Sequence, residues 1–253
     1  MAAESPEILT YRPATLPDGV APEPSARGAL YGLCSRLFTD PDVKLYELLA
    51  DGTVTAECRE LLEQTTLSVE PPDLTVSEEH ETLSARFNDL FVIGYSEVVD
   101  KTDGTMNNQG PPVSLYESDY RAERSWNDVN VDLARAYEFF GCEVDSEVRR
   151  NHDHLRLELE FMSYLCRREA AVDPGVAAAR IDFHDRHLRG FASGLADAVG
   201  AESGTGLFGR AADFLARFST ADIEELAARE IENPATRERE DQTIREREVS
   251  VDE

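Results

Sequence analysis

The sequence has little lysine, little cysteine and no long apolar run. Only Lys44 and Lys101 are lysines among 25 basic residues, and 51 acidic residues bring the formal net charge to −26. Such a chain repels phosphate, so nucleic acid is not an expected partner. No apolar run approaches the roughly 18 residues of a membrane span, and no basic segment followed by an apolar core opens the chain. We therefore expect a cytoplasmic protein without stable membrane insertion.

The small number of cysteines and the absence of common catalytic motifs limit the kinds of reaction that the chain could catalyse. Cys34, Cys58, Cys142 and Cys166 lie far apart and form no C-x-x-C pair, which favours buried thiols in a reducing cytosol over a metal site. A P-loop, a G-x-G-x-x-G loop and a G-x-S-x-G elbow are all absent from the sequence. We predict a binding protein without a cofactor rather than an enzyme.

Three explanations compete for the acidity: a halophilic cytoplasm in which a carboxylate surface keeps the protein in solution, a basic partner, and divalent metal binding. The acids are spread over every segment, which favours the halophilic explanation. A basic partner remains open.

Apolar spacing predicts an all-α fold of about nine to eleven helices, because no segment alternates as a strand does. At 253 residues the chain can bury roughly 70–75% of its unfolded surface, so it needs no disulfides to fold. We divide it into a disordered tail (1–25), an N-terminal helical subdomain (26–145), a hinge with a C-terminal helical subdomain (146–231) and a charged disordered tail (232–253).

Helix starts and one long loop can be predicted from capping residues and breakers. Ser25 is an expected N-cap, Thr75 with Glu78 an expected capping box, and Asn127 or Asp128 an expected cap. The Gly, Asn, Asp and Pro residues of 95–115 predict a long loop, a kind of segment that is often functional.

Residues 110–168 are the segment around which we expect the other helices to pack. Residues 153–168 predict a central helix that is apolar on most of its circumference, with one polar arc made by Arg156, Glu160, Ser163 and Arg167. His154 and Glu158 share another, otherwise apolar face. A buried acid is rare unless paired. Glu158 is therefore either satisfied by an arginine or tyrosine of the fold, or part of a binding site.

Two weaker alternatives remain: a generic helical adaptor with an acidic surface, and a metal-dependent enzyme. His152, His154 and Glu158, with His184 from a later helix, could ligate zinc or iron in a metal-dependent helical enzyme. The spacing is not H-E-x-x-H, and H-x-H at a helix start is a weak signal. We also expect that His154 can titrate near neutral pH.

Four segments carry a family resemblance: LYGLCSRLFTDP (30–41), ARFNDLFVIG (85–94), GPPVSLYES (110–118) and NHDHLRLELEFMSYL (151–165). Their order and spacing resemble the TorD/DmsD/NarJ family of cytoplasmic chaperones dedicated to molybdenum-cofactor oxidoreductases. The resemblance covers roughly residues 27–220. It implies a larger N-terminal and a smaller C-terminal helical part, and binding of the catalytic subunit of a DMSO, TMAO or nitrate reductase or a related dehydrogenase, often through its twin-arginine leader. A monomer or a domain-swapped dimer is expected.

The family motifs can be carried over residue by residue. Its Pro-Pro-x-x-Ser-x-Tyr pattern falls nearby as Pro111, Pro112, Ser114 and Tyr116, and Ser and Tyr are each placed a little differently among family members. Its Glu-Pro-x-Asp-His hinge motif falls at 150–154, where Asp153 and His154 match and Arg150 and Asn151 depart, so the hinge lacks the rigidity that proline would give. The implied client-binding and hinge residues are Pro111, Pro112, Ser114, Tyr116, Glu117, Tyr120, Asp153, His154 and Glu158.

A receptor for an arginine-containing apolar leader needs exposed carboxylates beside apolar and aromatic side chains. Glu117, Asp119, Asp153 and Glu158 could supply the carboxylates, and Tyr116, Tyr120 and Trp126 the aromatic surface. For these three rings, ordinary core packing is the competing interpretation. Asp153 also has two competing interpretations. It is either a cap or first-turn acid of the central helix, or a hinge acid that orders the linker and faces the client.

Overall fold

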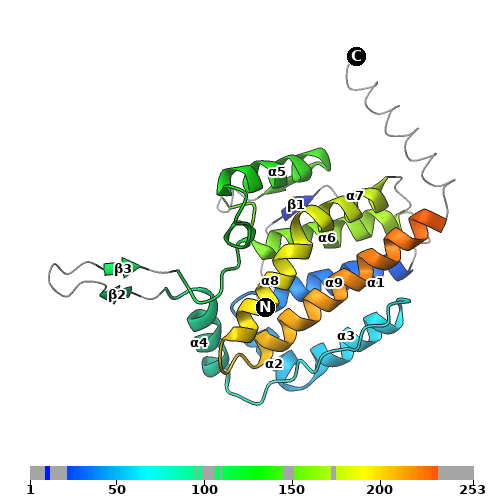
Figure 1. Cartoon of the computed structure of the whole chain (residues 1–253). Coiled ribbons are helices and arrows are strands. Elements are labelled where there is room, and N and C mark those ends of the chain that lie inside the picture. The colour runs from blue at the N-terminus through cyan, green and yellow to red at the C-terminus, as the bar shows by residue number, and fades with distance from the viewer. Residues whose placement is uncertain are drawn as a thin grey trace.

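The computed structural model describes residues 9–11, 22–94, 96–98, 106–108, 110–144, 151–171 and 175–232. The helices of these ranges are α1 (Pro22–Leu37), α2 (Val43–Ala50), α3 (Thr53–Glu63), α4 (His80–Phe91), α5 (Trp126–Phe139), α6 (Leu155–Ala170), α7 (Val176–Phe183), α8 (Arg189–Ala201) and α9 (Leu207–Glu232). The π-helical segment η2 (His184–Leu188) joins α7 to α8 without a break. The described chain therefore holds eight separate helical segments, slightly fewer than predicted, and the all-α class is confirmed (Figure 1).

Two short ladders accompany the helices. β1 (Leu9–Tyr11) pairs antiparallel with β4 (Cys142–Val144), and β2 (Ser96–Val98) pairs antiparallel with β3 (Met106–Asn108). Strands of three residues are too short to show a period in sequence, so none was predicted. In Figure 1 the β2 and β3 hairpin projects from the helical body, within the range expected to be a plain loop.

Several predicted boundaries are wrong. α1 begins at Pro22, because proline is well suited to the first helical turn, so Ser25 is not its N-cap. β1 and the first turn of α1 fall inside the range predicted as a disordered tail; residues 1–8, 12–21 and 233–253 lie outside the described residues. α4 begins at His80, beyond the predicted capping box of Thr75 and Glu78.

The start of α5 is capped by Ser125 rather than by Asn127 or Asp128. Ser125 Oγ accepts a hydrogen bond from the Asp128 backbone N–H (3.2 Å), and the Asp128 carboxylate accepts one from the Ser125 N–H (3.4 Å). The predicted cap Asp128 is thus the third residue of a capping box.

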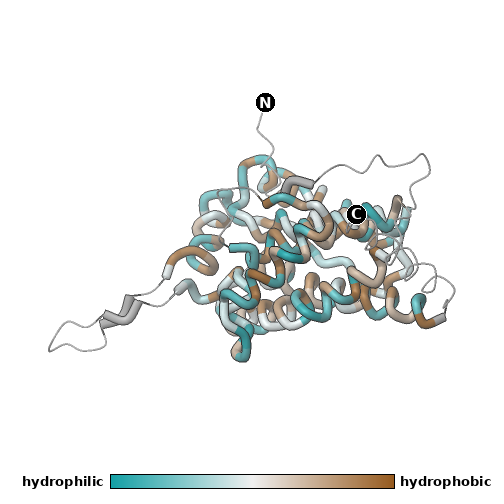
Figure 2. Tube along the Cα trace, turned by 90° about the horizontal axis from the view of Figure 1, so that it is seen from above, coloured by the Kyte–Doolittle hydropathy of each residue, from teal (hydrophilic) through white to brown (hydrophobic). Residues whose placement is uncertain are grey.

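α6 is the central helix, as predicted, and most of its side chains are buried. α1 packs along it so closely that a Cβ added to Gly28 would lie 3.1 Å from both Cys166 Cβ and the Ser163 carbonyl oxygen. This contact explains why Glu160 and Ser163, predicted to form a polar arc, are instead buried. Figure 2 shows polar and apolar stretches alternating along the helices, as expected when each helix buries one face.

A single hydrophobic cluster runs through the described residues. It takes side chains from α1 to α4 as well as from α6 to α9, so the two proposed subdomains share one core and their division stays a prediction. All four cysteines are buried and free, as predicted. Among the described helices, none has the length and apolar character needed to cross a membrane.

Candidate functional site

The loop that contains Pro111 and Pro112 contacts the hinge segment that directly precedes α6. We call residues 110–121 together with 151–158 the hinge junction. Tyr116 and His154 form an isolated antiparallel bridge, in which the Glu117 N–H donates to the Asp153 carbonyl (2.8 Å) and the Leu155 N–H donates to the Leu115 carbonyl (2.9 Å). The two segments that carry the predicted site residues are therefore in direct contact.

The loop half of the hinge junction is held by its own side chains. Ser114 Oγ donates to Asp119 Oδ2 (2.5 Å) and accepts from the Tyr116 N–H (3.1 Å), while the Tyr120 hydroxyl donates to the Ser114 carbonyl (2.8 Å). The Val113 N–H donates to the Leu90 carbonyl (3.0 Å), which ties the loop to α4. The end of the loop forms one 3-10 turn, η1 (Glu117–Tyr120).

His154, not Asp153, caps α6. Its Nδ1 accepts a hydrogen bond from the Arg156 N–H (3.1 Å), and the Tyr116 ring stands edge-on to it at a centroid distance of 5.1 Å. Burial, together with the Arg156 charge, lowers the pKa of His154 to about 4. The imidazole is therefore neutral at physiological pH, and the expectation that it titrates near neutrality is wrong.

Asp153 lies before the cap and is fully buried. Its Oδ2 accepts hydrogen bonds from the Ser118 hydroxyl (2.6 Å) and the Ser118 N–H (3.3 Å), whereas its Oδ1 has no hydrogen-bond partner among the described residues. Asp153 is thus neither a cap nor a first-turn acid. It links the start of α6 to η1 through Ser118, and its burial keeps it from facing a partner directly.

Glu158 is also fully buried, and neither carboxyl oxygen has a hydrogen-bond partner in the described part of the chain. The interpretation that an arginine or tyrosine satisfies it is therefore wrong. Burial, then the negative charges of Glu117 and Asp153, raise the pKa of Glu158 well above its ordinary value, and Arg121 opposes this only in part. A protonated side chain is the form that this site favours.

Glu117 is the third buried acid, and it is well partnered. Arg121 Nε donates to its Oε1 (2.9 Å), and His187 Nδ1 lies 2.9 Å from its Oε2. Arg121 Nη2 also donates to the carbonyls of Arg186 (2.6 Å) and His187 (2.8 Å) in η2. One guanidinium therefore joins the hinge junction to the π-helical turn, where the widened backbone offers its carbonyls.

Arg121 and His187 were not predicted site residues. A π turn has no sequence signature of its own, and Arg121 is one of many arginines spaced four residues from an acid. The loop also packs closely on α8, because a Cβ added to Gly194 would lie 2.6 Å from Tyr120 Cδ1. This packing supports the scaffold interpretation for Tyr120.

The predicted residues divide by exposure. Glu117, Asp153 and Glu158 have no exposed surface. Those that are half-buried are Pro111, Pro112, Ser114, Tyr116, Tyr120 and His154. Trp126 is 51% exposed and Asp119 is exposed, so among the four carboxylates expected to face a partner only Asp119 stands at the surface.

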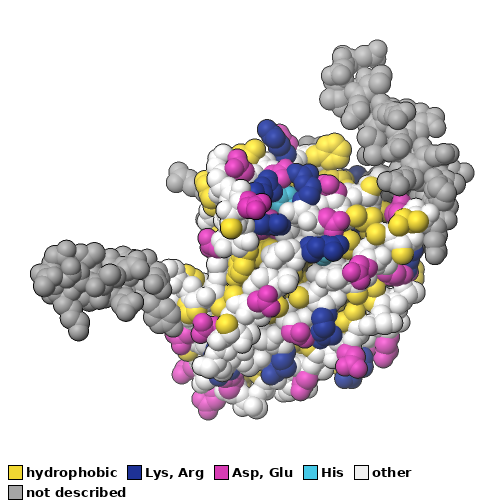
Figure 3. Space-filling model, in the orientation of Figure 1, with side chains coloured by type: hydrophobic (Ala, Val, Ile, Leu, Met, Phe, Trp, Pro, Cys, Tyr) yellow, Lys and Arg dark blue, Asp and Glu magenta, His cyan; other side chains and the backbone are white. Residues whose placement is uncertain are grey.

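The metal alternative gains no support from the geometry. His184 lies on η2, and in the described ranges no group of three or more His, Cys, Asp or Glu side chains is arranged to hold a metal ion. Several acidic side chains elsewhere on the surface form ion pairs with arginines. Figure 3 shows basic side chains gathered at the end of the molecule that carries α5 and η2, where Arg186 Nη2 lies 2.5 Å from Asp132 Oδ1 and Arg124 Nη2 2.9 Å from Asp132 Oδ2.

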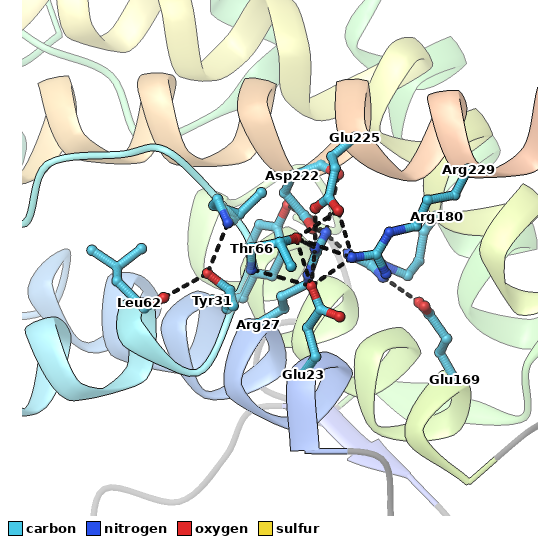
Figure 4. A network of polar contacts seen from close by, with 12 residues as sticks. Glu23, Arg27, Tyr31, Leu62, Thr66, Glu169, Arg180, Asp222, Glu225 and Arg229 are labelled. Carbon is cyan, nitrogen blue, oxygen red and sulfur yellow. Dashed lines mark hydrogen bonds and ion pairs between the residues drawn. The ribbon is translucent and has the colours of Figure 1, made fainter.

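A second buried polar cluster, which we call the arginine network, was missed entirely (Figure 4). Asp222 on α9 accepts from Arg27 on α1 (2.6 Å), Arg180 on α7 (2.5 Å) and the Tyr31 hydroxyl (2.7 Å). Burial opposes ionisation of Asp222, but Arg180 and Arg27 outweigh it and hold its pKa below the ordinary value. The residues around this centre are Glu23, Thr66, Glu169, Glu225 and Arg229.

Comparison with known proteins identifies the family of the chain. The family model described as nitrate reductase delta subunit matches residues 49–197. The selenate reductase assembly chaperone protein of Thauera selenatis is 35% identical over 116 residues, 43% of this chain and 53% of that protein. The chlorate reductase assembly chaperone protein of Ideonella dechloratans is 37% identical over 115 residues, 43% of this chain and 52% of that protein. The chain thus spans about half the length of these two relatives.

Two further matches are longer and more distant. The perchlorate reductase assembly chaperone protein of Dechloromonas aromatica is 27% identical over 212 residues, 79% of this chain and 90% of that protein. A solved structure of a proposed redox enzyme maturation protein from Archaeoglobus fulgidus covers 76% of this chain and 92% of its own, at 19% identity and a TM-score of 0.45. Because the family model matches more than half of the sequence, this protein belongs to the nitrate reductase delta subunit family, which confirms the resemblance to the TorD/DmsD/NarJ chaperones.

Proposed function

We propose that this protein is a cytoplasmic, system-specific chaperone and not an enzyme. It binds the catalytic subunit of a molybdopterin-dependent oxidoreductase and holds it until the cofactor is inserted. The observation that carries the proposal is the family membership, since the relatives named above are assembly chaperones for selenate, chlorate and perchlorate reductases. The client is by this inference a reductase of related chemistry.

The hinge junction is our proposed client site. Its exposed and half-buried parts present Asp119, Tyr116 and His154 together, with Trp126 at the start of the neighbouring α5. An acidic and aromatic surface of this kind suits a segment with arginine and apolar side chains, such as a twin-arginine leader. The buried acids Asp153 and Glu117 would then position this surface rather than touch the client.

Client capture tests the proposal. The purified chain is mixed with the cofactor-free catalytic subunit of a molybdopterin-dependent reductase, with and without its leader, and the complex is measured by affinity pull-down. We expect capture of the cofactor-free subunit, weaker capture of the cofactor-loaded one, and at least about tenfold weaker capture by Asp153→Asn and His154→Ala, a loss of about 1.4 kcal/mol.

Asp213→Asn is the matched control, because Asp213 is an exposed acid of α9 that pairs only with Arg217 among its described neighbours. It should capture the client as well as wild type does. Each variant is also melted, so that lost capture can be separated from lost fold. If the cofactor-free subunit is not captured at all, the chaperone proposal fails. If it is captured and both hinge variants still hold it, the client site lies elsewhere.

A further inference from the structure

The hinge junction gathers three acids where no solvent reaches them. Glu117 comes from η1, Asp153 from the hinge and Glu158 from the first turns of α6, and each has no exposed surface. Two of them are held by neighbours: Glu117 by Arg121 and His187, and Asp153 by Ser118. Glu158 has no hydrogen-bond partner for either oxygen among the described residues. The centre of the hinge junction is therefore a carboxyl group without a compensating cation of its own.

The groups that face Glu158 come from every element around it. Glu117 and Arg121 lie on η1, Asp153 precedes α6, and Tyr137 reaches in from α5. His154 stands one turn earlier on the same helix and is neutral, while His187 of η2 meets the cluster through Glu117. Among the described residues, two negative charges (Glu117 and Asp153) and one positive charge (Arg121) thus act on Glu158, which a neutral carboxylic acid tolerates better than a carboxylate does.

The acids are brought together by contacts between the loop and the hinge. The loop supplies Glu117 and Ser118, and the hinge supplies Asp153, with the bridge between Tyr116 and His154 closing the two segments. If the loop lifts away, Glu117 leaves with it and water reaches Glu158. The carboxyl group then returns to the behaviour of an ordinary glutamic acid.

We propose that the hinge junction is a proton-operated latch, in which Glu158 holds a proton while the loop is closed on the hinge and releases it to water when the loop opens. Opening and proton release are coupled. Above the ordinary pKa of 4.5 for a glutamic acid, a rise in pH therefore favours the open form, until the raised pKa of the closed form is reached. Coupling to one proton allows the opening equilibrium to change by up to about tenfold per pH unit.

This latch is a property of the chain itself. That opening would change the surface offered to a client rests on the proposed function, so the test uses no client. Hydrogen exchange is followed by mass spectrometry on the full chain at about pH 5.5 and about pH 7.5, with rates corrected for the intrinsic pH dependence of exchange. Peptides covering 110–121 and 151–158 are compared with peptides from α9.

For wild type we expect protection of the hinge junction to fall about tenfold or more from the lower to the higher pH, while α9 keeps its protection. Glu158→Gln, which keeps the shape and cannot ionise, should lose this pH dependence, and Glu158→Met provides the same test if the glutamine variant does not fold. His187→Gln is the matched control. It should retain the dependence, because its imidazole contacts Glu117 and not Glu158.

Three results would overturn the latch. Protection that is the same at both pH values in wild type shows that no proton is released on opening. A dependence that persists in Glu158→Gln or disappears in His187→Gln assigns the proton to another group. A fall of the same size in α9 means that pH acts on the whole fold.

Discussion

The arginine network and the hinge junction are both buried and both contain acids, but they balance charge in opposite ways. In the arginine network each oxygen of Asp222 meets a guanidinium, Oδ1 that of Arg27 and Oδ2 that of Arg180. In the described part of the hinge junction, Arg121 pairs with Glu117 and is the guanidinium whose charge acts on Glu158. The pKa of Asp222 is accordingly lowered and that of Glu158 raised.

This difference separates a structural role from a responsive one. A buried acid whose charge is matched stays ionised and ties its elements together, here α1, α7 and α9. A buried acid whose charge is not matched can be accommodated only by taking up a proton, so its state depends on pH and on local opening. Perturbed acids of this second kind cluster at functional sites, which agrees with the proposed role of the hinge junction.

The largest effect is expected from breaking the arginine network. Asp222→Asn leaves Arg27 and Arg180 buried together without their shared counter-charge, which should cost about 3–5 kcal/mol of the free energy of unfolding. For a chain of this size Tm would fall by roughly 6–20 °C in a thermal melt. Asp213→Asn on the exposed face of the same helix should shift Tm by less than about 2 °C. Equal shifts in the two variants would mean that Asp222 is no more important than a surface acid.

The next largest effect is expected at Glu158, where substitution should raise the stability of the fold rather than lower it. Glu158 has a raised pKa in the folded state, so its contribution to stability is complete below about pH 4.5 and is lost as pH rises. Asp222 has a lowered pKa, so its contribution is present above its ordinary value of 3.8 and is lost as pH falls further.

A Tm profile from about pH 3 to pH 9 should therefore decline at both ends. Glu158→Gln should flatten the alkaline side alone and raise stability there by about 1 kcal/mol or more. A variant that melts below wild type at about pH 8 would show that the ionised carboxylate stabilises the fold, contrary to the charge imbalance seen around it.

The smallest effect is expected at the edge of the arginine network. Arg229 is 40% exposed and pairs with Glu23 and Glu225, so Arg229→Ala should cost no more than about 1 kcal/mol and leave client capture unchanged. Chemical denaturation with the pull-down described above measures both quantities. A loss as large as that of Asp222→Asn would place the strength of the arginine network at its surface rather than at its buried centre.

Much of the fold can be predicted from the sequence, for local reasons. The apolar spacing of residues 153–168 predicts a buried central helix because helical periodicity is a property of neighbouring residues, and α6 confirms it. The family resemblance assigns the segment from Pro111 to Tyr116 and the Asp153 and His154 pair to one set of site residues, and the structure brings the two segments into contact. Helix caps were less predictable, since Ser125 and not Asp128 heads the capping box that both residues form.

The sequence by itself determined the helical class, the central position of α6, the burial of the four cysteines and the family. Each depends on local spacing or on a short motif. Only the tertiary structure decided which buried charges are matched. Arg27 and Asp222 are far apart in sequence and meet because α1 and α9 pack side by side, whereas Glu158 lacks a partner because no guanidinium from a neighbouring element reaches its oxygens in the described chain. Electrostatic matching depends on distances between elements, and no local pattern encodes those distances.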